Sequence, residues 1–247
     1  MSSGDTPHPG LKGADLQRSA PLVRYGGMLP EDLMLLFIDE ETGRVLMDTT
    51  AIHNALAGAV LLELVNSGRV ALEPDGKALA VVDTTPLPSE FLQESLSRLA
   101  KPMKPQRAVE TLRTHVRDNV MAQLEGRGVL SVEKTRMLGI FPTTSYVIQD
   151  RKAISDLRDA VGDVALGHRA PDERTGALIS LLYAVKALHK VFDGDRREMN
   201  ARAEEISAGN WAGAAVKKAM EAVQGALMAM MVATTVAATI TTAGGSS

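Results

Sequence analysis

Histidines and paired charged residues are the side chains of this 247-residue chain that could bind a metal or take part in catalysis. Few of them stand at the spacings that such sites require. The five histidines are His8, His53, His115, His168 and His189. No two of them have the spacing that would place two metal ligands on one face of a helix, so we predict no metal site. His115 precedes Asp118 by three residues, which would put a carboxylate and an imidazole on the same side of a helix.

Signatures of catalysis are missing from the sequence. The chain has no cysteine, which excludes disulfides, iron–sulfur clusters, thiolate zinc sites and cysteine nucleophiles. We find neither a glycine-rich phosphate loop nor a G-x-S-x-G nucleophile elbow. The acidic pairs Glu31-Asp32 and Asp193/Asp195 stand where helices are expected to begin, an ordinary place for negative charge. We therefore expect a protein that is not an enzyme and has no cofactor.

Two arginines four residues apart are the best candidates for binding an anion. Arg113 and Arg117 belong to segment 106–125, whose apolar residues recur at helical spacing and predict one amphipathic helix. On such a helix the two guanidinium groups would lie side by side and could hold a lipid headgroup phosphate. The alternative is that they are solvated charges paired with Glu110 and Asp118.

A short apolar strip over 137–141 is the second candidate surface. It carries Leu138, Ile140 and Phe141 between polar flanks, and Pro142 follows it directly. Because proline cannot donate a hydrogen bond to a central strand, we predict a projecting hairpin tip that contacts a membrane or another protomer. The alternative is burial of the strip against its own domain.

The composition narrows the class of protein. Hydrophobic residues make up 45% and charged residues 23%, which is typical of a globular chain. The net charge of −3 and the 3% of aromatic residues argue against nucleic acid as a partner. The first ten residues do not resemble a signal peptide, so we expect a cytoplasmic protein. The alanine- and arginine-rich, cysteine-free composition suggests a bacterial source.

The apolar patterning predicts a mostly α-helical fold: a single compact domain around a core helix bundle, with small β-hairpins. We expect a flexible arm over 1–27, the helical domain over 28–241 and a frayed end over 242–247. Helices are predicted to begin at Leu29 and to span 50–67, 89–100, 106–125, 150–166, 171–192, 195–207 and 211–240, with hairpins near 70–82 and 129–148.

Residues 222–247, where the C-terminal helix is expected, carry no charge, so this segment could be a membrane span or a buried helix. That run is long enough to cross a membrane, but it is rich in alanine and threonine and contains Gln224 and Gly225. We predict a buried bundle helix instead. Its inward residues would be Val223, Leu227, Met231, Val232, Val236 and Ile240.

Several short segments, taken in order, make the chain resemble the Golgi phosphoprotein 3 family, with correspondence from Leu29 to about Ala233. The segments are 29–36 (LPEDLMLL), 58–70 (GAVLLELVNSGRV), 116–118 (VRD), 128–130 (GVL), 133–134 (EK), 141–144 (FPTT) and 172–179 (DERTGALI). The resemblance implies a helical domain with a projecting hairpin at about 132–148, which in relatives serves membrane insertion or oligomer contacts. It also implies a non-enzymatic peripheral membrane adaptor, which in eukaryotic members binds phosphatidylinositol 4-phosphate and recruits glycosyltransferase tails.

The headgroup pocket implied by the resemblance is largely altered here. Its tryptophan position corresponds to Asp48, and its three arginine positions correspond to Ala57, Thr114 and Arg117, so only Arg117 is retained. A carboxylate at Asp48 would repel a phosphate. Two hypotheses follow. The chain is either an anionic-lipid-binding peripheral protein of the cytosolic membrane face, or a soluble interaction or oligomeric module that has lost lipid binding.

Overall fold

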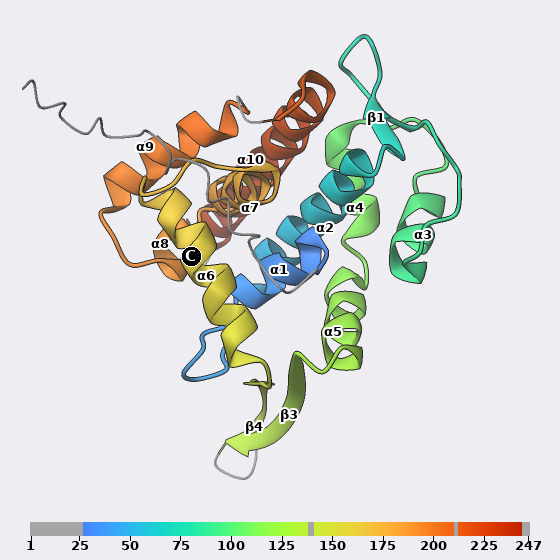
Figure 1. The fold of residues 1–247 in the computed structure, drawn as a ribbon. Helices are drawn as coiled ribbons and strands as arrows, with labels where there is room; N and C mark the ends of the chain where they lie inside the picture. Colours follow the sequence, from blue (N-terminus) through green and yellow to red (C-terminus); the bar gives the residue numbers. More distant parts are fainter. Residues whose placement is uncertain (1–26, 138–140, 210–211, 244–247) are drawn as a thin grey trace, which may run out of the picture.

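The computed structural model describes residues 27–137, 141–209 and 212–243, and side chains within these ranges except at 134–144 and 234–243. The predicted mostly α-helical fold is confirmed (Figure 1). The elements are α1 (Leu29–Leu36), α2 (Thr49–Asn66), β1 (Val70–Leu72), β2 (Leu79–Val81), α3 (Glu90–Ser97), α4 (Pro105–Leu112), α5 (Val116–Gly126), β3 (Leu130–Met137), β4 (Phe141–Ile148), α6 (Arg151–Ala165), α7 (Glu173–Ala184), α8 (Leu188–Val191), α9 (Arg196–Ser207) and α10 (Ala214–Ala243).

Helix α2 is the centre of the fold. The Asp48 carboxylate begins it by accepting a hydrogen bond from the Ala51 amide at 2.9 Å. Its apolar residues cover its whole circumference, and α1, α4, α5, α7 and α10 pack around it. At Gly58 an added Cβ would lie 2.9 Å from Leu227 Cδ1 of α10, so the absence of a side chain allows the two helices to approach closely.

An arginine of α6, Arg158, bonds the end of α1 and the segment that follows it. Arg158 donates hydrogen bonds to the carbonyl oxygens of Leu36 and Ile38 at 3.2 and 2.5 Å, and its guanidinium pairs with Glu40 at 2.7 Å. These contacts supply partners for carbonyls at the end of α1. They fix the turn over residues 39–45. This turn also contacts β4, where the Tyr146 amide donates a hydrogen bond to the Gly43 carbonyl at 3.0 Å.

Both predicted hairpins are present, at the positions that the sequence analysis gives them. Strands β3 and β4 pair antiparallel from Leu130↔Ile148 to Met137↔Phe141. Pro142 does not interrupt this pairing; it lies in β4 opposite Arg136. A two-stranded ribbon has two free edges, where a residue without an N–H group is tolerated.

The predicted single helix over 106–125 is wrong. The structure has α4 and α5 instead, separated by His115 in a left-handed conformation with φ +60°. Arg98 accounts for the break, because its guanidinium donates to the carbonyls of Thr111 and Thr114, which the broken helix leaves without partners. The predicted helix over 171–192 is likewise divided into α7 and α8, with Lys186 at φ +57°.

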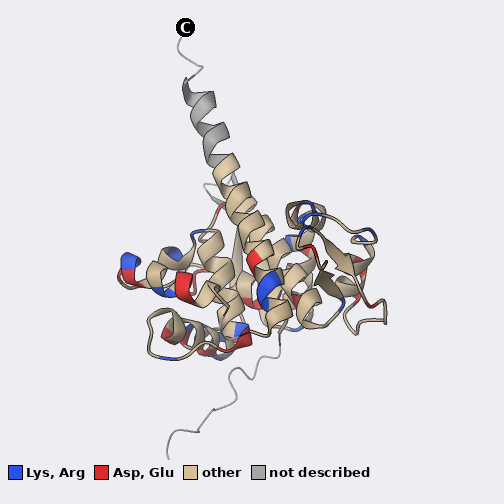
Figure 2. Ribbon diagram, turned by 90° about the horizontal axis from the view of Figure 1, so that it is seen from above, with Lys and Arg blue, Asp and Glu red and all other residues tan. Residues whose placement is uncertain are grey.

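Helix α10 packs on α2, α4, α7 and β1, and its described part lies across the body of the molecule in Figure 2. Val223 and Leu227 are buried as predicted, whereas Val232 is 58% exposed, so its assignment to the buried face is wrong. The side chains of Val236 and Ile240 lie outside the described set. Within the described ranges, no helix combines the length and the apolar character that crossing a bilayer requires.

Candidate functional site

The break between α4 and α5 determines where the two candidate arginines lie. Arg113 caps the C-terminal end of α4, and Arg117 is the second residue of α5. They therefore stand on either side of a turn rather than on one face of a helix. We call Arg113, His115, Arg117 and Asp118, together with His53 on α2, the α4–α5 corner.

Arg117 is engaged with the hairpin. Its Nη2 donates to the Tyr146 hydroxyl at 2.6 Å, and its guanidinium carbon lies 5.9 Å from the centroid of the Tyr146 ring. Tyr146 is buried, so this contact ties the start of α5 to β4. A guanidinium has five N–H donors, which leaves most of them for another ligand.

Arg113 is the more available of the two arginines. Its side chain is exposed and makes no ion pair or hydrogen bond with any residue that the structure describes. The two acids that could have neutralised the pair form no ion pair with either arginine among the described residues. Glu110 pairs with Arg107 at 3.2 Å, and Asp118 Oδ2 lies 3.8 Å from His115 Nδ1. The alternative of simple pairing with Glu110 and Asp118 is therefore not what the geometry shows.

His53 on α2 belongs to the same electrostatic environment. Its pKa is lowered from the ordinary value of 6.5, first by burial and then by the positive charges of Arg117 and Arg113, with Asp118 acting in the opposite direction. The imidazole is therefore neutral at pH 7. His53 on α2 thus feels charges on the adjacent helices α4 and α5, which begin about fifty residues or more further along the chain.

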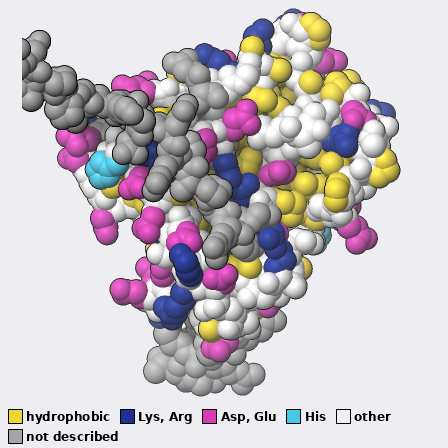
Figure 3. All heavy atoms as spheres, in the orientation of Figure 1, with side chains coloured by type: hydrophobic (Ala, Val, Ile, Leu, Met, Phe, Trp, Pro, Cys, Tyr) yellow, Lys and Arg dark blue, Asp and Glu magenta, His cyan; other side chains and the backbone are white. Residues whose placement is uncertain are grey.

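An open depression of about 580 Å³ lies on the other side of Arg117, between α5 and the β3–β4 hairpin. Asp118, Met121, Glu125 and Tyr146 are among its lining residues. Two carboxylates beside one guanidinium make it a poor anion site. On the face in Figure 3, basic and acidic side chains are likewise interspersed, and hydrophobic ones gather towards α3 and the β1–β2 hairpin.

The positions that the resemblance assigns to a headgroup pocket have structural roles here. Asp48 is exposed and caps α2, and Ala57 is fully buried in the core. Thr114 is exposed, and its carbonyl oxygen accepts a hydrogen bond from Arg98 at 3.1 Å. Of the four positions, Arg117 alone offers a cation at the corner.

The apolar strip lies where β3 turns into β4. Leu138 and Ile140 lie outside the described residues. Phe141 begins β4 opposite Met137, and its side chain also lies outside the described set. The proposed contact with a membrane or a second protomer therefore remains a prediction.

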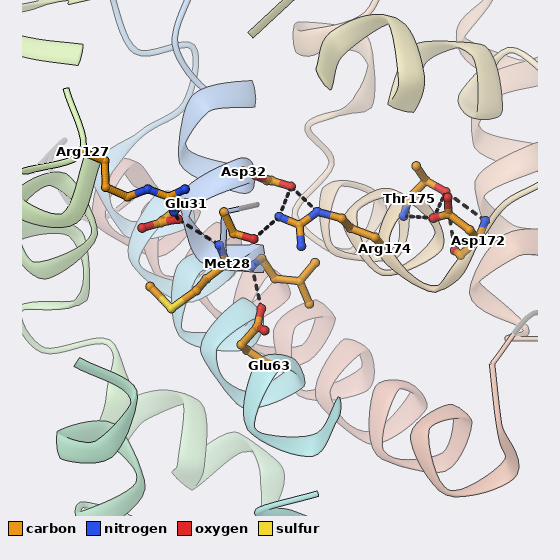
Figure 4. Close-up of polar contacts among 10 residues, drawn as sticks. Met28, Glu31, Asp32, Glu63, Arg127, Asp172, Arg174 and Thr175 are labelled. Atoms are coloured by element: carbon orange, nitrogen blue, oxygen red, sulfur yellow. Dashed lines mark hydrogen bonds and ion pairs between the residues drawn. The ribbon is translucent and has the colours of Figure 1, made fainter. Parts of the chain in front are cut away.

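A second polar constellation, which the sequence reasoning missed, lies buried at the start of α1 (Figure 4). Glu31 Oε2 accepts hydrogen bonds from the Met28 amide at 2.9 Å and from Arg127 Nη1 at 2.8 Å. Glu63 Oε2 of α2 accepts from the Leu29 amide at 2.6 Å. These carboxylates supply partners for amides that the first turn of a helix leaves free.

The neighbouring Asp32 carboxylate pairs with an arginine of α7. Asp32 Oδ2 accepts from Arg174 Nε at 2.6 Å, and Arg174 also donates to the Gly27 carbonyl. Burial raises the pKa of Asp32 from 3.8 to about 7, because the cost of desolvation exceeds the opposing effect of Arg174. The expectation that Glu31 and Asp32 are ordinary helix-start charges is incomplete, because both are fully buried.

One signal in the sequence could have revealed this network. Glu31 and Asp32, Glu63 and Arg174 belong to three of the segments that carry the family resemblance.

Residues 29–223 match the Golgi phosphoprotein 3 (GPP34) family, a match that covers far more than half of the chain. The chain belongs to this family. The Golgi phosphoprotein 3 family is non-enzymatic, and both the α4–α5 corner and the buried network lie within the matched residues.

Proposed function

We propose that this member of the Golgi phosphoprotein 3 family is an adaptor-like peripheral membrane protein that binds anionic phospholipid headgroups at the α4–α5 corner, on the cytosolic face of the membrane. The observation that carries the proposal is the exposed Arg113 near Arg117 at the break between α4 and α5, where neither Glu110 nor Asp118 forms an ion pair with Arg113 among the described residues. A phosphodiester placed there would meet two guanidinium groups.

The expected strength of this contact is modest. A cation near an anionic membrane surface contributes about 1 kcal/mol, so two arginines alone give weak and reversible binding. Stable attachment needs a second anchor. We propose that the hairpin strip with Leu138, Ile140 and Phe141 provides it, by dipping into the bilayer interface.

The proposed site is not selective for phosphatidylinositol 4-phosphate. Three of the four pocket residues implied by the family resemblance are replaced, by Asp48, Ala57 and Thr114. The bidentate contacts that the replaced side chains would make, and that distinguish one headgroup from another, are lost. We expect vesicles with phosphatidylglycerol and vesicles with phosphatidylinositol 4-phosphate of equal surface charge to bind the protein within about threefold of each other.

Co-sedimentation with vesicles tests the proposal. The protein should pellet with phosphatidylcholine vesicles containing phosphatidylglycerol and not with phosphatidylcholine alone, and Arg113→Glu should reduce the pelleted fraction severalfold. Arg197→Glu is the matched control, since Arg197 is exposed on α9, on another part of the surface. If wild-type protein pellets equally with acidic and neutral vesicles, the proposal is wrong.

The second candidate is a soluble, non-enzymatic interaction module that works through a protein partner or a homo-oligomer. The engagement of Arg117 with Tyr146 favours it, because it gives the one retained pocket residue a structural role. This candidate predicts no vesicle binding at any charge. It also predicts a mass above 26.3 kDa in light scattering, lowered by aspartate at Leu138 and Ile140.

A further inference from the structure

Helix α5 lies beside the base of the β3–β4 hairpin (Figure 1), and the open depression between them carries charges of both signs. Its charged lining residues are Arg117, Asp118 and Glu125, and Met121 and Val132 add apolar surface. Asp118, Met121 and Glu125 are three and four residues apart, so they share one face of α5. The volume of about 580 Å³ falls within the range of small-molecule sites. This lining suits a ligand that is itself both positive and negative.

The two opposite charges contact the hairpin at a single cross-strand pair. Val132 of β3 lies opposite Tyr146 of β4. Arg117 Nη2 donates to the Tyr146 hydroxyl at 2.6 Å, and Glu125 Oε1 accepts a hydrogen bond from the Val132 amide at 3.1 Å. Residues opposite each other in an antiparallel pair have Cα atoms only about 5 Å apart. The hairpin therefore gathers a guanidinium and a carboxylate that come from opposite ends of α5.

Both groups keep capacity for a ligand. Among the described residues, Arg117 uses one of its five N–H donors on Tyr146, and Glu125 uses one carboxylate oxygen on Val132, which leaves Oε2 as an acceptor. His115 precedes α5 without capping it by its side chain, so the amides of the first turn add positive potential beside Arg117. A phosphate is thus favoured at the Arg117 end of the depression and an ammonium group at the Glu125 end.

We propose that this depression binds the ethanolamine headgroup of an aminophospholipid, with the phosphodiester on Arg117 and the primary ammonium on Glu125. The inference rests on the proposed function: Arg113 holds the anionic surface, and the depression selects a second headgroup beside it. Two methylene groups join the phosphate to the ammonium in this headgroup, and Met121 and Val132 supply the apolar surface that they would cover.

The chemistry separates ethanolamine from the other common headgroups. A primary ammonium has three N–H donors for the Glu125 carboxylate, whereas the quaternary ammonium of choline has none. Phosphatidylethanolamine and phosphatidylcholine have the same net charge, so a preference between them reports this contact rather than the overall attraction to a charged surface. Glycerol and inositol headgroups carry no cation and leave the carboxylates of Asp118 and Glu125 beside a phosphate, where they repel it.

The test uses two kinds of vesicle with the same fraction of phosphatidylglycerol, one completed with phosphatidylcholine and the other with phosphatidylethanolamine. The site variant is Glu125→Gln, whose amide oxygen can still accept from the Val132 amide but carries no charge. Glu204→Gln is the matched control, because Glu204 is exposed on α9. Since an exposed ion pair contributes little, wild type and control should bind the ethanolamine vesicles about three- to fivefold more tightly, and Glu125→Gln less than twofold.

Soluble headgroups give a second readout that does not depend on bilayer packing. Glycerophosphoethanolamine, titrated into ¹⁵N-labelled wild-type protein, should shift the amide signals of Val132 and Tyr146, and glycerophosphocholine and inorganic phosphate should shift them much less at equal concentration. Equal shifts from the three compounds would overturn the inference.

The vesicle experiment separates failure of this inference from failure of the proposed function. Equal wild-type binding to the two kinds of vesicle, or an ethanolamine gain that survives in Glu125→Gln, would overturn the inference and leave binding to phosphatidylglycerol intact. If the wild type binds neither kind of vesicle, the proposed function itself is refuted.

Discussion

Removing the cation beside Asp32 should make the stability of the protein fall further as the pH rises than it does in the wild type. Arg174 of α7 supplies the hydrogen bond and the opposite charge that lower the pKa of this buried carboxyl. The other carboxylate oxygen, Oδ1, accepts no hydrogen bond from any residue within the described ranges. Arg174→Met keeps much of the apolar stem and removes the charge, so the pKa of Asp32 should rise above its present value of about 7.

The sign and size of the effect follow from the two pKa values. In the unfolded chain Asp32 titrates near 3.8, and in the folded protein near 7, so between these values only the folded state holds the proton. The stability contributed by Asp32 is therefore highest at acid pH and falls as the pH rises through this window. At about 1.4 kcal/mol per pKa unit, the wild type loses about 4 kcal/mol over the window.

The variant should lose little at pH 5, where Asp32 is protonated in both proteins. There we expect a cost of about 1 kcal/mol, for the hydrogen bonds that Arg174 donates to Asp32 and to Gly27. At pH 8.5 the wild-type carboxylate is ionised and paired, whereas the variant carboxylate is ionised without its cation or stays protonated at a cost. We expect a destabilisation of about 3–5 kcal/mol at that pH.

Urea unfolding followed by circular dichroism, at pH 5.0 and at pH 8.5, measures the difference. Arg197→Met is the control, because Arg197 is exposed on α9, and it should change stability by less than about 0.5 kcal/mol at both pH values. Adding Asp32→Asn to Arg174→Met should abolish the pH-dependent part. An Arg174→Met cost of the same size at both pH values would refute the assignment of a raised pKa to Asp32.

Two further substitutions test the contacts that hold the hairpin base. Gly43→Ala should lower the free energy of unfolding by at least about 3 kcal/mol, because Gly43 has φ +63° and an added Cβ would lie 2.2 Å from the Tyr146 carbonyl oxygen. Gly68→Ala is the control: Gly68 has φ +70° but open space around it, so this change should cost only about 1 kcal/mol in thermal unfolding. Equal costs would contradict the close approach. Tyr146→Phe should cost about 1 kcal/mol by removing the hydroxyl that Arg117 binds, and it should leave phosphatidylglycerol binding equal or stronger, because a donor is released. Weaker vesicle binding in this variant would show that the tyrosine itself contacts the lipid.

The sequence by itself determined the helical class of the fold and many of the points where helices begin. Asp150 and Asp195 cap α6 and α9 where the sequence analysis placed helix starts, because an N-cap side chain bonds amides only two or three residues away. The hairpin β1–β2 follows in the same way from two short apolar runs around a turn. The family could also be inferred, since it depends on the order of segments along the chain.

Tertiary structure decided what lies at the candidate site. The helix break at His115 depends on Arg98, which comes from another element and supplies partners for carbonyls that a continuous helix would have bonded internally. The burial of Asp32 depends on α7, which brings Arg174 from 142 residues away. Local spacing describes neighbours within one or two turns of a helix. Burial, charge pairing and the effect of Arg117 on the pKa of His53 depend on contacts between distant segments, and those contacts exist only after the core around α2 has packed.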